Sequence, residues 1–118
     1  MTPETSYRAA QYWLDQFWLA YRPDFDDDLP VLLGAMALNT DGQPMDPACA
    51  GDWSLALHEA GHGLPALVQF LEGWRARGEG KDNDISRLLT WIQDFPHSAE
   101  QLWQEAEAAV GSPSLQAE

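Results

Sequence analysis

The sequence predicts an all-α protein, a compact bundle of about six short helices. Six segments carry apolar residues at spacings of three and four positions, which is the period of one helix face. Proline, glycine and acidic turn residues separate these segments, and no run of alternating apolar and polar residues indicates a strand. With 118 residues, 45% of them hydrophobic, the chain suits a single globular domain over residues 1–118.

The first two helices are expected on either side of an acidic turn. Thr2 followed by Pro3 joins an N-cap residue to a proline at the first helical position, so the first helix should begin there and run to about Arg22. Its expected core stripe is Tyr7, Ala10, Leu14, Phe17, Trp18 and Tyr21. The acids at 26–28 then offer caps for a short helix over residues 29–38.

The third and fourth helices are expected to form a close pair. Asp46 and Pro47 open the third helix by the same combination of cap and proline, and Gly61 and Gly63 end it. Pro65 is expected to start the fourth. Their expected inward residues are Trp53, Leu55 and Leu57, then Leu67, Phe70, Leu71 and Trp74.

The last two helices are marked by caps and by one proline. Asp82 or Asn83 is expected to cap the fifth helix, and Pro96 to break it. Ser98, with Gln101 three residues later, forms a capping box for the sixth. The expected inward residues are Ile85, Leu88, Leu89 and Ile92, then Leu102, Trp103, Ala106 and Val110.

The two halves of the chain show a faint similarity. FWLAYR at 17–22 matches FLEGWR at 70–75, and DDLPVLLGAM at 27–36 matches NDISRLLTWI at 83–92. A true duplication predicts two three-helix units related by a pseudo-twofold axis. Chance agreement between amphipathic helices is the alternative.

The units predicted by such a duplication are residues 1–62 and 63–110. Neither unit would bury its apolar face alone, so the two would have to share one core. The tail at 111–118, GSPSLQAE, is expected to be frayed.

Charge is the unusual property of the composition. Nineteen acidic residues stand against six Lys and Arg, which gives a net charge of −13. Between Pro23 and Trp74 there is no Lys or Arg. Such a surface repels nucleic acid and anionic lipid, and it speeds capture of a basic protein. The alternative is that the charge only keeps the protein in solution.

The cellular compartment is predicted from cysteine use and from hydropathy. Cys49 is the only cysteine, so an intramolecular disulfide is impossible and a reducing cytoplasm is the simplest location. The N-terminus has no basic stretch followed by an apolar one, and no apolar run approaches the roughly 20 residues that span a bilayer. We therefore expect a cytoplasmic protein without a membrane partner. The oligomeric state stays open.

Residues 58–62 read HEAGH, which matches the H-E-x-x-H signature of zinc peptidases. On a helix, His58 and His62 could face one metal ion while Glu59 activates a water molecule. The phrase resembles the active-site helix of the zincin metallopeptidases. The resemblance covers only residues 57–63.

Several features argue against a zinc enzyme. A catalytic zinc needs a third protein ligand, and the candidates are His97 or an acid such as Asp82, Asp84 or Glu100, none of which lies in a second motif. Gly61 also weakens the helix between the two histidines. We therefore expect no catalysis, no metal and no cofactor, with His58 and Glu59 solvated and His62 near a helix C-terminus. A zinc peptidase and non-catalytic metal binding remain the alternatives.

A longer resemblance lies at residues 27–53, DDLPVLLGAMALNTDGQPMDPACAGDW. The segment has paired acids, a short LL-G-x-M helix, a D-G-x-P turn, and then D-P-A and D-W on the next helix. With the aromatic helix YWLDQFWLAYR before it, the pattern resembles the immunity proteins of bacterial contact-dependent growth inhibition and related polymorphic toxin systems. The resemblance implies a protein that binds and blocks a cognate toxin, typically a nuclease with a basic cleft.

The expected contact residues are acids in loops, namely Asp24, Asp26, Asp27, Asp28 and Asp41. For Asp28 a role as a helix cap is the stronger interpretation, and the same holds for Asp46; Asp52 also ranks lower as a contact. The predicted function is thus that of a non-enzymatic immunity protein with a basic, nuclease-like toxin as partner. An acidic adaptor, or a nucleic-acid mimic without a toxin partner, is a further alternative.

Overall fold

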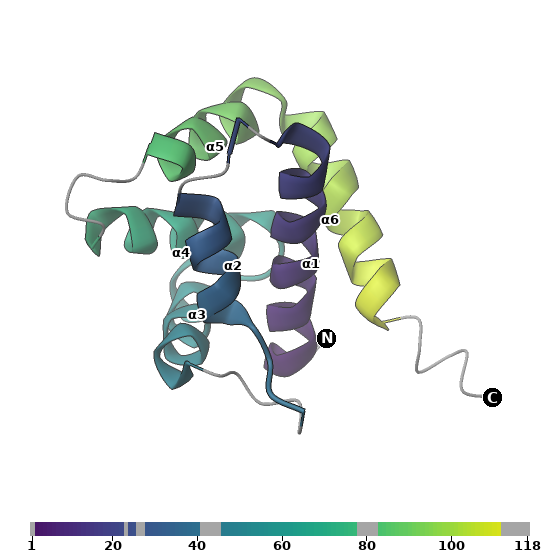
Figure 1. Cartoon of the computed structure of the whole chain (residues 1–118). Helices are drawn as coiled ribbons and strands as arrows, with labels where there is room; N and C mark the ends of the chain where they lie inside the picture. Colours follow the sequence, from purple (N-terminus) through teal and green to yellow (C-terminus); the bar gives the residue numbers. More distant parts are fainter. Residues whose placement is uncertain (1, 23, 26–27, 41–45, 78–82, 112–118) are drawn as a thin grey trace.

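The computed structural model describes residues 2–22, 24–25, 28–40, 46–77 and 83–111. Over these residues the chain folds into six helices and no strand, which confirms the all-α prediction (Figure 1). The helices are α1 (Pro3–Tyr21), α2 (Asp28–Met36), α3 (Pro47–Ala60), α4 (Leu64–Arg77), α5 (Asn83–Asp94) and α6 (Pro96–Gly111). None of these helices is both long and apolar enough to cross a bilayer.

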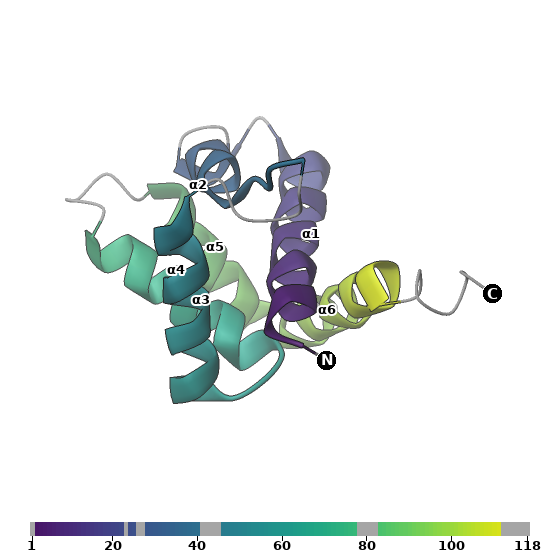
Figure 2. The ribbon, with the colours of Figure 1, turned by 90° about the horizontal axis from the view of Figure 1, so that it is seen from below.

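Helix α1 is the centre of the bundle. It begins as predicted, with Pro3 in the first turn and the Thr2 side chain accepting a hydrogen bond from the Thr5 amide at 3.1 Å. Both views show α1 between α6 on one side and the α3–α4 pair on the other (Figures 1 and 2). The expected core stripe of α1 therefore differs from the observed one at two residues. It omitted Trp13, which is fully buried, and it included Tyr21, which is 42% exposed.

Helix α6 runs antiparallel to α1 and packs along it (Figure 1). The Trp13 indole donates a hydrogen bond to the Ala99 carbonyl at 3.0 Å, so a buried polar group on α1 has its partner in the first turn of α6. The prediction for the start of α6 was wrong. The helix begins at Pro96, and the Ala99 amide bonds to the Phe95 carbonyl, so Ser98 lies inside the first turn.

Helix α3 starts as the sequence predicts, because the Asp46 side chain accepts a hydrogen bond from the Ala48 amide at 3.0 Å. The cap role of Asp46 is thus confirmed. The inward face was predicted less well: Trp53 is buried, but Leu55 is 54% exposed. Successive helix positions turn by about 100°, so a residue two places from Trp53 points away from the core.

Helix α2 is joined to α1 by a buried hydrogen bond. The Tyr7 hydroxyl donates to the Met36 carbonyl at 3.0 Å, which satisfies one of the carbonyls left without an intrahelical partner in the last turn. Burial, and to a lesser extent the charges of Cys49 and Asp46, raise the pKa of the Tyr7 hydroxyl well above its usual range. The Tyr7 phenol therefore keeps its proton, and remains a donor, at neutral pH and well above it. The carbonyl that it binds marks the end of α2 at Met36, two residues before the expected end.

The halves of the proposed repeat are interlocked. Helix α3 packs on α4, and α1 packs on α6, so the most extensive helix pairs join residues 1–62 to residues 63–110. One core of buried apolar residues draws on all six helices. The duplication itself stays a prediction, and most of the tail at 111–118 lies outside the described residues.

Candidate functional site

The predicted contact acids lie around the connection between α1 and α2. Asp24 is exposed, and Asp28 is the half-buried first residue of α2, so it lies inside the first turn rather than at the predicted cap position. Asp26, Asp27 and Asp41 lie outside the described residues. The sequence places Asp26 and Asp27 between Phe25 and Asp28, so four acids belong to one five-residue stretch, which we call the acidic segment (residues 24–28).

Phe25 anchors the acidic segment to the core. Its ring is buried and meets the Phe17 ring edge-on, with centroids 4.9 Å apart. The Arg87 guanidinium of α5 lies over the same ring, 4.5 Å from its centroid. The residue that follows Asp24 is therefore held between α1 and α5.

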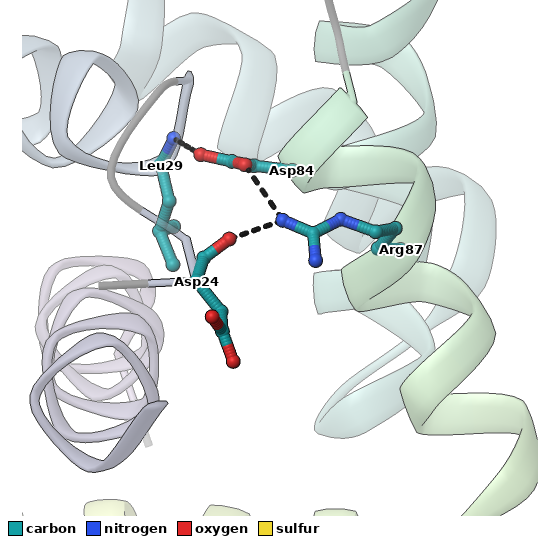
Figure 3. A network of polar contacts seen from close by, with 4 residues as sticks. All are labelled: Asp24, Leu29, Asp84 and Arg87. Carbon is teal, nitrogen blue, oxygen red and sulfur yellow. Dashed lines mark hydrogen bonds and ion pairs between the residues drawn. The ribbon is translucent and has the colours of Figure 1, made fainter. Parts of the chain in front are cut away.

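A polar network on α5 holds the backbone of the same segment (Figure 3). Asp84 is only 1% exposed, and one of its carboxylate oxygens accepts a hydrogen bond from the Leu29 amide at 3.2 Å. Its other oxygen pairs with Arg87 at 3.2 Å, and Arg87 also donates to the Asp24 carbonyl. Asp84 thus supplies, from another helix, an acceptor for the first turn of α2.

The network leaves the Asp24 side chain available for contacts. Figure 3 shows the Asp24 carboxylate directed away from Arg87, which binds the backbone carbonyl instead. The sequence did not reveal this role for Asp84, which was considered only as a possible zinc ligand. Its Leu29 partner is 55 positions earlier in the chain, and no local pattern marks such a contact.

Four other acids of the base-free stretch belong to the described part of the chain. Asp46, Glu59 and Glu72 are exposed, and Asp52 is half-buried. Asp52 and Glu59 line a hollow of about 80 Å³ between α3 and α4. This volume is far below the several hundred Å³ that a small-molecule site usually needs.

The HEAGH stretch does not lie on one continuous helix. α3 ends at Ala60, and Gly61 follows with φ 88° and ψ −158°, a conformation that is nearly restricted to glycine. His58 is in the last turn of α3, whereas His62 lies beyond the end of the helix. The two histidines therefore lack the four-residue helical spacing that makes H-E-x-x-H a metal motif.

The groups around the two histidines are also not arranged for zinc chemistry. His58, His62 and Glu59 are exposed, and Glu59 accepts a hydrogen bond from the Gln69 side chain at 3.1 Å. His97 lies on a different helix, in the first turn of α6. Over the described residues, no group of three or more His, Cys, Asp or Glu side chains could hold a metal ion.

Zinc analysis tests this geometry. We expect protein purified without a histidine tag to contain well below one zinc ion per chain, because α3 ends at Ala60 and the two histidines do not share one helix. Elemental analysis of wild-type protein and of His58→Ala would show the same metal content. One tightly held zinc per chain that is lost in His58→Ala would instead establish a metal site.

A larger hollow, of about 440 Å³, opens beside α1. Its lining is Arg8, Gln11, Tyr12, Asp15, Leu33 and Val110. The lining contains no histidine, cysteine or serine, so it holds neither a Ser–His nor a Cys–His pair.

The fold and the site together describe an all-α bundle in which Asp24, Phe25 and the start of α2 are held against α5. No known protein family, no curated protein and no solved structure matches this chain significantly.

Proposed function

We propose that this protein is an immunity protein, which binds a cognate bacterial toxin with a basic surface and blocks it. The observation that carries the proposal is the anchored acidic segment, where four acids fall within five residues next to a buried phenylalanine. The resemblance of residues 27–53 to immunity proteins points to the same function. The protein performs no chemistry of its own in this proposal.

The anchoring of the acidic segment matters for binding strength. A flexible acidic loop would lose conformational freedom when it docked, and that loss would reduce the affinity. Here Phe25 is packed in the core, and Arg87 holds the Asp24 carbonyl before any partner arrives. Because the backbone is held in advance at Asp24 and Phe25, more of the electrostatic attraction at Asp24 appears as binding free energy.

The charge distribution favours a cationic partner. Over residues 23–74 there is no Lys or Arg, so a basic protein meets attraction along the whole base-free stretch. Long-range attraction of this kind raises association rates by about 10- to 1,000-fold. In a nuclease cleft, carboxylates at this density would occupy positions that nucleic-acid phosphates take.

Charge reversal at Asp24 tests the location of the contact. We expect Asp24→Lys to slow association with the toxin by about tenfold, since steering depends on charge close to the interface. The double variant Asp26→Lys/Asp27→Lys should act in the same direction and weaken the salt dependence. Stopped-flow mixing would measure the rate constants.

The matched control for Asp24→Lys is Glu4→Lys. It changes the net charge equally, but Glu4 is exposed at the opposite end of α1, roughly 25 Å along the helix axis from Tyr21. We expect its association rate to stay within about twofold of wild type. Equal slowing in both variants would mean that only the total charge matters, and would remove Asp24 from the interface.

Co-expression tests the function itself. The cell should survive expression of the toxic protein encoded by the neighbouring gene only when this protein is present, and the two should copurify. Survival without this protein, or protection without a complex, would contradict the proposal. An acidic adaptor would form complexes but rescue no cell.

A further inference from the structure

A continuous series of ring contacts runs from the core to the surface between α1 and α5. At its buried end Trp13 stacks on Phe17, with ring centroids 5.6 Å apart. Phe17 contacts Tyr21 at 4.6 Å and Trp91 at 4.9 Å, and Trp91 contacts Phe95 at 5.6 Å. The series therefore connects a fully buried tryptophan to side chains in solvent.

The outer end of the series is an exposed aromatic surface. Tyr21 is 42% exposed, Phe95 is 51% exposed and Trp91 is half-buried between them. Tyr21 and Trp91 are in contact, with ring centroids 5.8 Å apart. We call these three residues the aromatic patch. Leaving such rings in water forgoes burial energy, and aromatic residues that remain exposed are typical of binding surfaces.

We propose that the aromatic patch is the anchor of the partner interface, and that it takes arginine or lysine side chains of a basic protein on its ring faces. The inference rests on the proposed function for the identity of that protein. The rings already touch one another and the core, so docking would order few new rotamers. The acidic segment would speed the encounter, and the patch would slow the release.

The protein itself shows this kind of contact twice. The Arg22 guanidinium lies 4.6 Å from the centre of the Trp18 ring, and the Arg87 guanidinium lies 4.5 Å from the centre of the Phe25 ring. Arginine stacks well on aromatic faces, because its weakly hydrated guanidinium is attracted by the ring quadrupole. Guanidinium groups from a partner would extend the same chemistry to the patch.

Two acids and two arginines lie near the patch, and the exposed acids favour a cation over a second copy of this chain. The arginines, Arg22 and Arg87, already stack on Trp18 and Phe25, and Arg87 also pairs with Asp84. Exposed Asp24 precedes Phe25, whose ring lies 6.4 Å from the Tyr21 ring, and exposed Asp94 directly precedes Phe95. Two copies that met at the patch would bring these carboxylates together on molecules that each carry −13 charges. A partner with arginine and lysine side chains would neutralise them.

An arginine-glycine pentapeptide is the probe for the patch, and aromatic proton and carbon NMR shifts are the readout. We expect saturable shifts at Tyr21, Trp91 and Phe95 with this peptide, and none with a glutamate-glycine peptide of equal length. The double variant Tyr21→Ala/Phe95→Ala should weaken peptide binding by roughly tenfold or more. Shifts that are absent, or unchanged affinity in the double variant, would overturn the proposal.

The complex with the toxin gives a second readout. We expect dissociation to accelerate about tenfold in Phe95→Ala and in Phe95→Leu, since leucine keeps apolar area but lacks a ring face. Leu19→Ala is the matched control, because Leu19 is 54% exposed and belongs to none of these ring contacts. If Phe95→Leu dissociated at the wild-type rate, the cation contact would be refuted at that ring.

The two proposals fail in different ways. If the neighbouring gene's product does not bind the wild-type protein, the proposed function fails, while the peptide experiment still decides the patch. If the toxin binds but its complexes with all patch variants dissociate at the wild-type rate, the aromatic patch is not the anchor, while the proposed immunity function is retained. A wild-type dimer that Tyr21→Ala/Phe95→Ala converts to monomer would assign the patch to a second copy.

Discussion

Replacement of Trp13 by alanine is expected to lower the free energy of unfolding by about 3–5 kcal/mol. Trp13 is fully buried, stacks on Phe17 and donates its indole N–H to the Ala99 carbonyl. The substitution removes the ring and leaves a large cavity between α1, α5 and α6. It also removes the donor for the Ala99 carbonyl.

Urea denaturation followed by circular dichroism measures this loss. Trp13→Phe should fall between the wild-type protein and Trp13→Ala, because phenylalanine refills most of the space but donates no hydrogen bond. Leu19→Ala, on an exposed face of the same helix, should change stability by no more than about 0.5 kcal/mol. A Trp13→Ala variant as stable as Leu19→Ala would show that the bundle does not close around Trp13.

Replacement of Asp84 by alanine is expected to cost about 2–3 kcal/mol of stability and to weaken partner binding. The change leaves the buried Leu29 amide without its acceptor, and it removes the carboxylate that positions Arg87. The start of α2 then loses its contact with α5, and Arg87 loses the carboxylate that orients it toward the Asp24 carbonyl. Asp84 is a positioning residue in this account, because it acts through Leu29 and Arg87 rather than by touching the partner.

The controls for Asp84 separate charge from position. Glu105→Ala removes the same charge from an exposed site on α6, and it should leave stability and partner binding nearly unchanged. Asp84→Asn keeps an oxygen that can accept from the Leu29 amide, so it should lose less stability than Asp84→Ala. Titration calorimetry with the toxin, combined with urea denaturation, measures both effects. Identical behaviour of Asp84→Ala and Glu105→Ala would refute the positioning role.

Local signals predicted the fold class and most helix starts. Thr2 and Asp46 cap α1 and α3 as expected, because a cap depends only on residues a few positions away. Pro96 was predicted only to end α5, but it is also the first residue of α6, because a proline that ends one helix can occupy the first turn of the next. The earlier start of α6, at Pro96 rather than just after Ser98, has this local cause.

Features that depend on packing were predicted less well. Trp13 was missed because α1 contacts helices on several sides, so its buried face is wider than one stripe. Leu55 was placed inward on hydrophobicity alone, although Trp53 fixes the core face of α3. Apolar periodicity identifies a helix more reliably than it identifies which of its faces are covered.

The candidate site also combines features that are visible in the sequence with features that only the fold creates. The sequence identified the acids of residues 24–28 and the weakness of the HEAGH match, since composition and the glycine at position 61 are both visible in it. It did not reveal that Asp84 and Arg87 hold that segment, or that Tyr21, Trp91 and Phe95 meet at the surface. These groups come from helices far apart in the chain, and only the fold brings them together.

The salt dependence of association tests most directly whether fixed negative charge on this protein captures a cationic partner. We would measure the association rate constant of the wild-type protein with the neighbouring gene's toxin from low to high ionic strength. We expect a fall of about tenfold or more as the Debye length shrinks from about 30 Å at 0.01 M to about 3 Å at 1 M salt. A rate that stayed constant, or rose with salt, would contradict it.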